Sequence, residues 1–166
     1  YNQIGFDFVP DRDLSALRDS GYVLDFMMRI NSSENLAPNV RFIDTKTGPG
    51  EHPWRMGYTI DAETVPSDSR WHHVHIPLQD FTERGSWDND TWYEPQGLFD
   101  WAAVDRFEIV AEHQDFENAW VWVDNLHVTN QDTALVRDTT TFTLPDSLTG
   151  LRKAQGQAEI TVYPNP

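Results

Sequence analysis

The segment "YVLDFMMRI", from Tyr22 to Ile30, decides the fold class. Apolar residues fill every second position from Leu24 onward, and Asp25 and Arg29 lie between them. An alternation of period two predicts a β-strand with one face in a core. Similar segments recur along the chain, separated by clusters of Gly, Pro, Asn and Asp, with almost no helical periodicity. The sequence therefore predicts an all-β protein built as an antiparallel sandwich or barrel.

The composition narrows the classes of partner. The chain has 166 residues, enough for one domain with a substantial core and a tail. It carries 27 Asp plus Glu against 12 Lys plus Arg, a formal net charge of -15, which argues against nucleic acid and anionic membranes as partners. The absence of cysteine excludes disulfides and thiol catalysis. Neither a signal peptide nor an apolar run long enough to span a bilayer is visible.

Outward tryptophans are a second feature of the predicted strands. The chain has 7 Trp, 5 Tyr and 9 Phe, and a domain of this size rarely buries every tryptophan fully. In "NAWVWVDNLHV", Val121 and Val123 are predicted to face inward, which places Trp120 and Trp122 outward. Flat indoles suit the apolar faces of sugar rings. In the alternative interpretation, the aromatic loop at residues 80–100 or the tail covers at least one of them.

The segment "RWHHVHIPLQDF" places histidines on a strand. If Val74 and Ile76 point inward, His73 and His75 share the outward face, about 6.5 to 7 Å apart. Two histidines at this spacing can bind one metal ion, but Gln79 stands where a cupin strand would supply a glutamate. A solvated sheet face and polar contacts on a ligand-binding face are the other interpretations.

The same parity in "VDRFEIVAEH" places Arg106, Glu108 and Glu112 outward. Glu108 and Glu112 are four residues apart on one strand, about 13 Å between Cα atoms, too far for the paired carboxylates of a glycosidase. A pair between strands, such as Glu108 with Asp25, stays open. The sequence selects no catalytic pair.

Two segments lack strand periodicity. The predicted loop at residues 80–100 carries Trp87 and Trp92, and its aromatic content indicates an ordered, functional loop. Residues 130–156 are rich in Thr, Asp, Gln and Gly and read as a linker. The chain closes on "AEITVYPNP", and residues 157–166 resemble the start of the C-terminal sorting domain of bacterial type IX secretion. This resemblance implies a secreted or cell-surface protein.

Four segments resemble β-sandwich carbohydrate-binding modules of the galactose-binding-like jelly-roll type, similar to family 11 and family 4 modules. They are "DLSALRDSGYVLDFMMR", "RWHHVHIPLQDFT", "FDWAAVDRFEI" and "VWVDNLHV". The resemblance spans residues 2–129, within a predicted carbohydrate-binding domain at residues 1–129. It implies a jelly roll that binds single glycan chains in a cleft across one sheet, within a larger secreted enzyme. By matching motifs, Trp71 and Asp124 carry over as scaffold positions.

The resemblance also implies a structural calcium ion, with Asp124 as one ligand, since oxygen ligands suit this hard cation. The relatives usually begin with a further strand that often supplies other calcium ligands. This sequence starts at Tyr1 without that strand, which is a departure from the pattern.

We therefore expect a non-catalytic carbohydrate-binding module that binds β-glucan or a related plant polysaccharide and targets an attached glycoside hydrolase. Outward tryptophans are expected to stack on sugar rings, and outward polar side chains to hydrogen-bond hydroxyl groups. The predicted stacking residues are Trp120, Trp122 and Trp54. The predicted hydrogen-bonding residues are His73, His75, Arg106, Glu108, Asp25, Arg29 and Arg55.

Two other functions remain open. The first is a jelly-roll polysaccharide lyase or hydrolase that uses His73 or His75, Arg106 and a tyrosine such as Tyr58. The second is a structural spacer, which requires the outward tryptophans to be buried. A separate hypothesis concerns the tail: residues 157–163 alternate like a strand and are predicted to pair with an open sheet edge.

Overall fold

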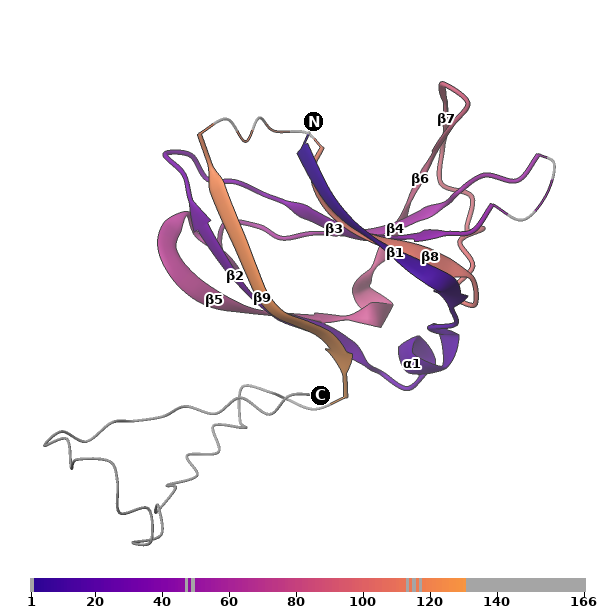
Figure 1. The fold of residues 1–166 in the computed structure, drawn as a ribbon, viewed down its shortest axis with the longest axis horizontal. Helices are drawn as coiled ribbons and strands as arrows, with labels where there is room; N and C mark the ends of the chain where they lie inside the picture. Colours follow the sequence, from indigo (N-terminus) through magenta and orange to yellow (C-terminus); the bar gives the residue numbers. More distant parts are fainter. Residues whose placement is uncertain are drawn as a thin grey trace, which may run out of the picture. The chain divides into compact units, whose positions relative to one another are not determined.

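The computed structural model describes residues 2–46, 48, 50–112, 114, 116 and 118–130, and strands dominate them (Figure 1). The elements are β1 (Asn2–Arg12), α1 (Ser15–Asp19), β2 (Val23–Asn31), β3 (Asn39–Asp44), β4 (Arg55–Thr59), β5 (Asp68–Pro77), the 3-10 turn η1 (Leu78–Asp80), β6 (Thr82–Asp88), β7 (Thr91–Tyr93), β8 (Val104–Ala111) and β9 (Trp120–Thr129). The predicted all-β antiparallel sandwich is confirmed. The jelly-roll type stays a prediction.

Two sheets of unequal width form the sandwich. The wider sheet has six strands in the order β1-β8-β3-β4-β6-β7, and the narrower one has three in the order β5-β2-β9 (Figure 1). All of the strand pairs are antiparallel. β2 is the centre of the narrower sheet, and it is the strand in which the sequence alternates most clearly.

The core lies between the sheets and follows the predicted alternation. From β2, every second residue from Leu24 to Ile30 is buried. Phe42 of β3 is the centre of an aromatic cluster, with ring centroids 5.3 Å from Phe81, 5.5 Å from Trp101 and 5.2 Å from Phe107. Aromatic pairs at such distances add to the hydrophobic gain of burial.

Strand β1 is only half covered. The sequence predicts Ile4, Phe6 and Phe8 on one face, and Phe6 does stack on Phe107 at 6.3 Å. Ile4 and Phe6 nevertheless remain 54% and 49% exposed. The reason is the difference in width, because β1 is the edge of the six-stranded sheet and three strands cannot cover six.

The predicted aromatic loop at residues 80–100 contains a β-hairpin formed by β6 and β7. Its turn is made by Asn89 and Asp90, which both have positive φ angles, 48° and 59°. Two consecutive left-handed residues form a type I′ turn, the usual two-residue hairpin turn. The hairpin pairs Trp87 directly with Trp92.

The predicted sorting segment, the proposed docked strand and the linker beyond Asn130 lie outside the described residues. Within the described part, no helix is long and apolar enough to cross a membrane.

Candidate functional site

The predicted site residues divide between the two outer faces of the sandwich. Arg55, Arg106 and Glu108 lie on the outer side of the six-stranded sheet, which we call the six-stranded face. The other set lies on the outer side of the three-stranded sheet, the three-stranded face. This second set consists of Asp25, Arg29, His73, His75, Trp120 and Trp122. The core separates the two faces, so these residues form two sites and not one.

Arg41 organises the charges of the six-stranded face. Its Nε donates to Oε2 of Glu108 at 2.7 Å, and its Nη1 donates to Oε1 of Glu112 at 3.2 Å. Arg41 and Glu108 are 3% and 2% exposed, although no second sheet covers this side. Arg55 Nη1 donates to the same Glu112 oxygen at 3.4 Å. One arginine therefore joins the two outward glutamates that are too far apart to meet directly.

A second arginine extends this network toward β1. Arg106 donates from Nη1 to Glu108 at 3.2 Å and from Nε to Asp7 at 2.6 Å. The hydrogen bond to Asp7, followed by that to Glu108, raises the pKa of the Arg106 guanidinium. Charge-assisted bonds of this kind fix the orientation of long side chains before a ligand arrives.

Glycines keep the floor of this face low. Gly5, Glu108, Arg41 and Gly57 are register partners in one row across four strands, so a glycine lies at each end of the buried ion pair. A Cβ at Gly57 would lie 3.0 Å from Cγ of Arg84, tighter than most real contacts. A larger side chain at this position would press against the Arg84 side chain.

The β6–β7 hairpin raises an aromatic wall beside this floor. Trp87 and Trp92 are both exposed, and the Arg55 guanidinium lies 5.6 Å from the Trp92 ring. Gly85 has φ +90°, and a Cβ there would lie 2.7 Å from the Trp92 ring and 2.4 Å from the carbonyl oxygen of Tyr93. The Trp92 indole therefore rests directly on the backbone of Gly85, which only glycine allows.

The hairpin is anchored to residues that precede β4 in the chain. Asp88 accepts hydrogen bonds from Lys46 and, at 3.1 Å, from Nδ1 of His52, and these partners lower its pKa. The His52 ring stacks on Tyr93 with centroids 3.6 Å apart. These contacts connect both strands of the hairpin to the segment between β3 and β4.

Two adjoining pockets lie between the floor and the wall, and we call them together the cleft. Their volumes are about 340 Å³ and 370 Å³, and Arg55 and Trp87 line both. The first also reaches Arg41 and Glu108, and the second reaches Trp92. Volumes of this size fall within the usual range for sites that bind small organic groups.

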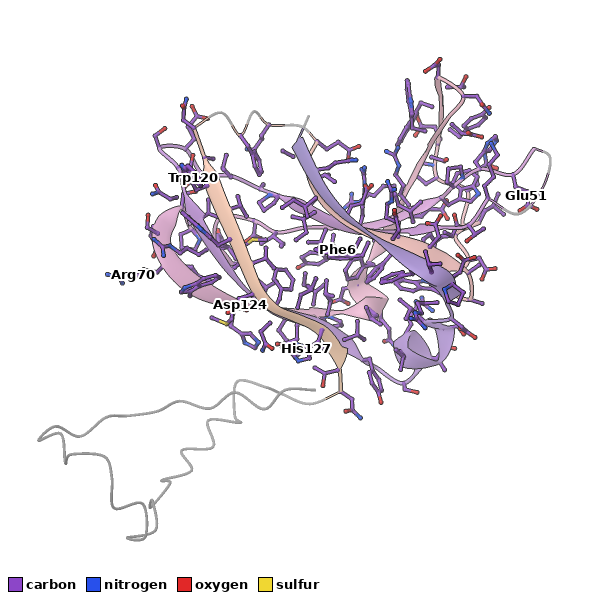
Figure 2. The ribbon with its side chains drawn as sticks, in the orientation of Figure 1. Phe6, Glu51, Arg70, Trp120, Asp124 and His127 are labelled. Carbon is purple, nitrogen blue, oxygen red and sulfur yellow. The ribbon has the colours of Figure 1, made fainter. Side chains whose placement is uncertain are left out.

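The three-stranded face carries an aromatic stripe. Arg29 is the register partner of Trp71 on β5 and of Trp122 on β9, and its guanidinium lies 4.6 Å from the Trp122 ring. Trp120 stacks on Trp122 with centroids 6.0 Å apart and is 65% exposed. Figure 2 shows Trp120 near the start of β9. The predicted outward parity of Trp120 is therefore confirmed.

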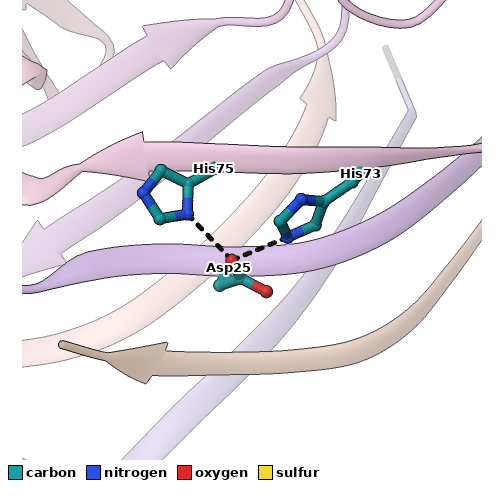
Figure 3. A group of neighbouring side chains, drawn as sticks. All are labelled: Asp25, His73 and His75. Carbon is teal, nitrogen blue, oxygen red and sulfur yellow. Dashed lines mark hydrogen bonds and ion pairs between the residues drawn. The ribbon is translucent and has the colours of Figure 1, made fainter. Parts of the chain in front are cut away.

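Farther along the same face, Asp25 meets two histidines. Its Oδ2 lies 2.7 Å from Nε2 of His73 and 3.0 Å from Nδ1 of His75 (Figure 3). Asp25 is 1% exposed, whereas both histidines reach the surface. Among the described residues, these three form the group of His, Asp and Glu side chains whose ligand atoms lie close enough to share a metal ion.

Trp54 is a correction to the predicted stacking set. It is 5% exposed, and its ring meets His52 edge-on at 5.9 Å. Trp54 has the same parity as Met56, which packs against the core, so its side chain points inward and offers no open face to a sugar. The prediction treated it as outward without knowing where β4 begins.

Asp124, the predicted calcium ligand, lies on the three-stranded face. Asp124 is exposed, and its Oδ1 accepts the backbone N–H of Asn125 at 2.8 Å. It does not belong to the group of clustered ligand atoms formed by Asp25 and the two histidines. A calcium ion at this position stays a prediction.

The residues of the alternative catalytic site do not come together. His73 and His75 lie on the three-stranded face, Arg106 lies on the six-stranded face, and Tyr58 packs against the core. Asp25 and Glu108, considered as a carboxylate pair, also lie on different sheets. The spacer hypothesis requires buried outward tryptophans, and Trp120 is exposed.

Sequence reasoning missed Arg41 and did not predict that Trp87 and Trp92 line a cleft. The hairpin tryptophans line the cleft and do not cover the aromatic stripe. The signal for the hairpin is the segment "WDNDTW", in which an Asn-Asp turn places two tryptophans opposite each other. For Arg41, the sequence offers only its outward parity in "NVRFIDT".

The comparisons with known proteins give one match. The family model described as "Carbohydrate binding domain 30" matches residues 3–130. The comparison with curated proteins found no match, and neither did the comparison with solved structures. The matched residues contain both sheets and both outer faces.

Proposed function

The chain belongs to the carbohydrate binding domain 30 family, and on this premise we propose that it binds a single β-glucan chain along the cleft of the six-stranded face. A carbohydrate-binding module has no chemistry of its own. Its role in the proposal is to hold an attached glycoside hydrolase on its substrate. The resemblance of residues 157–166 to a sorting segment supports secretion as part of the same proposal.

The observation that carries the proposal is the pairing of an aromatic wall with a fixed polar floor. Trp87 and Trp92 are 51% and 40% exposed, and the apolar faces of pyranose rings can stack on exposed indoles. Below them, Arg41, Arg55 and Glu112 hold one another in place by charge-assisted bonds. Sugar hydroxyl groups both donate and accept, so guanidinium and carboxylate groups side by side suit them.

The network also limits the entropy cost of binding. Arginine and glutamate side chains lose substantial rotamer freedom when a ligand orders them. Here the ion pairs have already ordered Arg41, Arg106 and Glu108. Binding energy from new hydrogen bonds is therefore not spent on ordering these side chains.

The net charge favours a neutral glycan. With a formal charge of -15, the chain repels a polyuronate at long range. A β-glucan carries no charge and avoids this repulsion. The negative net charge therefore favours β-glucan over acidic plant polysaccharides as the ligand.

The aromatic stripe of the three-stranded face is the second candidate surface. Trp120 and Trp122 stack nearly parallel, 18° apart, and Trp120 is the most exposed tryptophan of the described residues. An exposed aromatic patch is costly in water and commonly marks a binding surface. This surface is the one expected from the sequence, and it is the alternative that the test must separate from the cleft.

The test is calorimetric titration of the chain with a soluble β-glucan, comparing Trp92→Ala with Trp122→Ala. We expect Trp92→Ala to weaken binding by about 1–3 kcal/mol, the scale of an aromatic hot spot, and Trp122→Ala to leave affinity unchanged. Thermal melts check that both variants are folded. If Trp122→Ala weakens binding more than Trp92→Ala does, the glycan binds the aromatic stripe. Release of reducing ends by the purified chain would contradict a non-catalytic binding module.

A further inference from the structure

Three metal-binding atoms converge on the three-stranded face, opposite the cleft. They are Oδ2 of Asp25, Nε2 of His73 and Nδ1 of His75, and all lie within 4.8 Å of one another (Figure 3). We propose that this cluster binds one divalent transition metal ion of the Zn²⁺ class.

The register of the strands explains why two different imidazole nitrogens meet at one point. His75 is the direct cross-strand partner of Asp25, so its nearer nitrogen, Nδ1, reaches the carboxylate. His73 is one same-face position farther along β5, opposite Met27, and it reaches the carboxylate with its outer nitrogen, Nε2. The two rings therefore converge from different distances on the same oxygen.

Two of the three distances between the ligand atoms are already close to those around a bound ion. A tetrahedral ion bound at about 2.0–2.1 Å holds its ligand atoms about 3.3 Å apart. The nitrogens now lie 2.7 Å and 3.0 Å from Oδ2 of Asp25. Each imidazole nitrogen would move a few tenths of an ångström away from Oδ2 of Asp25. The two nitrogens, which lie within 4.8 Å of each other, would also come to about 3.3 Å apart, and both rings reach solvent and so can rotate.

The donor set indicates the class of ion. Two imidazole nitrogens and one carboxylate oxygen suit Zn²⁺, Co²⁺, Ni²⁺ and similar ions, whereas Ca²⁺ and Mg²⁺ prefer sets made of oxygen alone. Three protein ligands leave at least one coordination position open. Since His73 and His75 are on the solvent side of Asp25, that position faces water.

The cluster stands on the central strand of this sheet. Asp25 is in the central strand β2, which pairs with β5 on one side and β9 on the other. Below it, the neighbours Leu24 and Phe26 are fully buried in the core. Ligands on paired strands over a packed core hold their geometry better than ligands on loops.

The site is independent of the proposed glycan cleft. The cleft uses residues of the six-stranded face, and the core separates that face from Asp25. Loss of metal binding is therefore expected to leave β-glucan affinity unchanged. A failure of either proposal does not imply a failure of the other.

The test is a titration of the full chain, purified without a histidine tag and treated with a chelator, with Zn²⁺ in a calorimeter. We expect one ion per chain and no competition from Ca²⁺. His73→Ala and His75→Ala are each expected to weaken Zn²⁺ binding at least tenfold. The matched control is His72→Ala, on the same strand, because His72 bonds to Asp68 at 2.9 Å and is outside the cluster.

A second measurement needs no substitution. In nitrogen NMR of the unmodified chain, Zn²⁺ is expected to shift Nε2 of His73 and Nδ1 of His75 and to leave His72 unchanged. The proposal is wrong if no Zn²⁺ binds. It is also wrong if the double variant His73→Ala/His75→Ala binds Zn²⁺ as tightly as the unmodified chain, or if the ion shifts other histidines instead.

Discussion

The two outer faces of the sandwich present their aromatic residues differently, although each buries a carboxylate, Glu108 on one face and Asp25 on the other. The six-stranded face buries its charges, since Arg41 and Glu108 lie beneath other side chains, and raises its aromatics on a hairpin. On the three-stranded face, Trp120 is open to water and the Arg29 guanidinium lies over the Trp122 ring. A cleft with fixed charges can orient one glycan chain. The aromatic stripe provides contact area but no wall that would fix the direction of the chain.

The difference follows from the number of strands and from what is attached to them. Six strands provide a row such as Gly5, Glu108, Arg41 and Gly57 in which glycines at the ends leave room above the ion pair. The β6–β7 hairpin then adds a wall at one side. Three strands without such a hairpin give a surface with no wall, so its tryptophans stand exposed.

The largest effect that this comparison predicts is for Arg41→Met. Methionine keeps an unbranched stem but is shorter than arginine and uncharged, so it leaves Glu108 buried with a weaker set of cationic partners. Removing one partner of a buried pair typically costs 3–5 kcal/mol. We expect about 3 kcal/mol, the low end, because Arg106 still bonds to Glu108. Chemical denaturation measures the free energy of unfolding, and a cost below about 1 kcal/mol, the scale of an exposed pair, would show that the charges are not effectively buried.

Local alternation predicted the side of each strand on which a residue lies. Val121 and Val123 pack inward and Trp120 points outward, as expected, because parity depends only on neighbours two residues apart. Alternation says nothing about which sheet a strand joins. The Arg41–Glu108 contact spans 67 residues and the His75–Asp25 contact spans 50. The predicted single site mixed two faces for this reason.

Trp54 and the hairpin tryptophans show two other limits of the sequence. Trp54 directly precedes β4, and its direction depends on where that strand begins, a boundary that parity does not supply. Trp87 and Trp92 are opposite each other because Asn89 and Asp90 form a tight turn. That turn was readable in the sequence, but the position of the hairpin beside Arg55 depends on the pairing of β6 with β4.

A second prediction concerns pH and the six-stranded sheet. Burial raises the pKa of Asp44 to about 6, against the N–H donors of Asp100 and Trp54, which lower it. Because the pKa of this carboxyl group is higher in the folded state than in the unfolded state, the group's contribution to stability is fully present at pH values below its unfolded pKa. That contribution is lost as the pH rises through about 6. We expect the unmodified protein to lose on the order of 2 kcal/mol of unfolding free energy between pH 4 and pH 7 through this group, and Asp44→Asn to abolish that loss. Denaturation curves at the two pH values measure it for both proteins. Because the other carboxylates are common to both, equal pH dependence in the two would contradict the assignment.

The smallest effect is expected for Arg29→Met, the same substitution as Arg41→Met made on the three-stranded face. Arg29 stabilises the fold through its contact with the Trp122 ring, and a cation over an indole at a partly exposed site contributes about 0.5–1 kcal/mol. Its buried Nε has no hydrogen-bond partner among the residues that the structure describes, and methionine removes that unsatisfied group. Methionine can also contact the indole through its sulfur, which recovers part of the loss. The expected cost is therefore below about 1 kcal/mol, measured by the same denaturation experiment. If Arg29→Met instead destabilises the protein as much as Arg41→Met does, the two faces do not differ in how they hold charge, and the aromatic stripe depends on Arg29 as strongly as the cleft depends on Arg41.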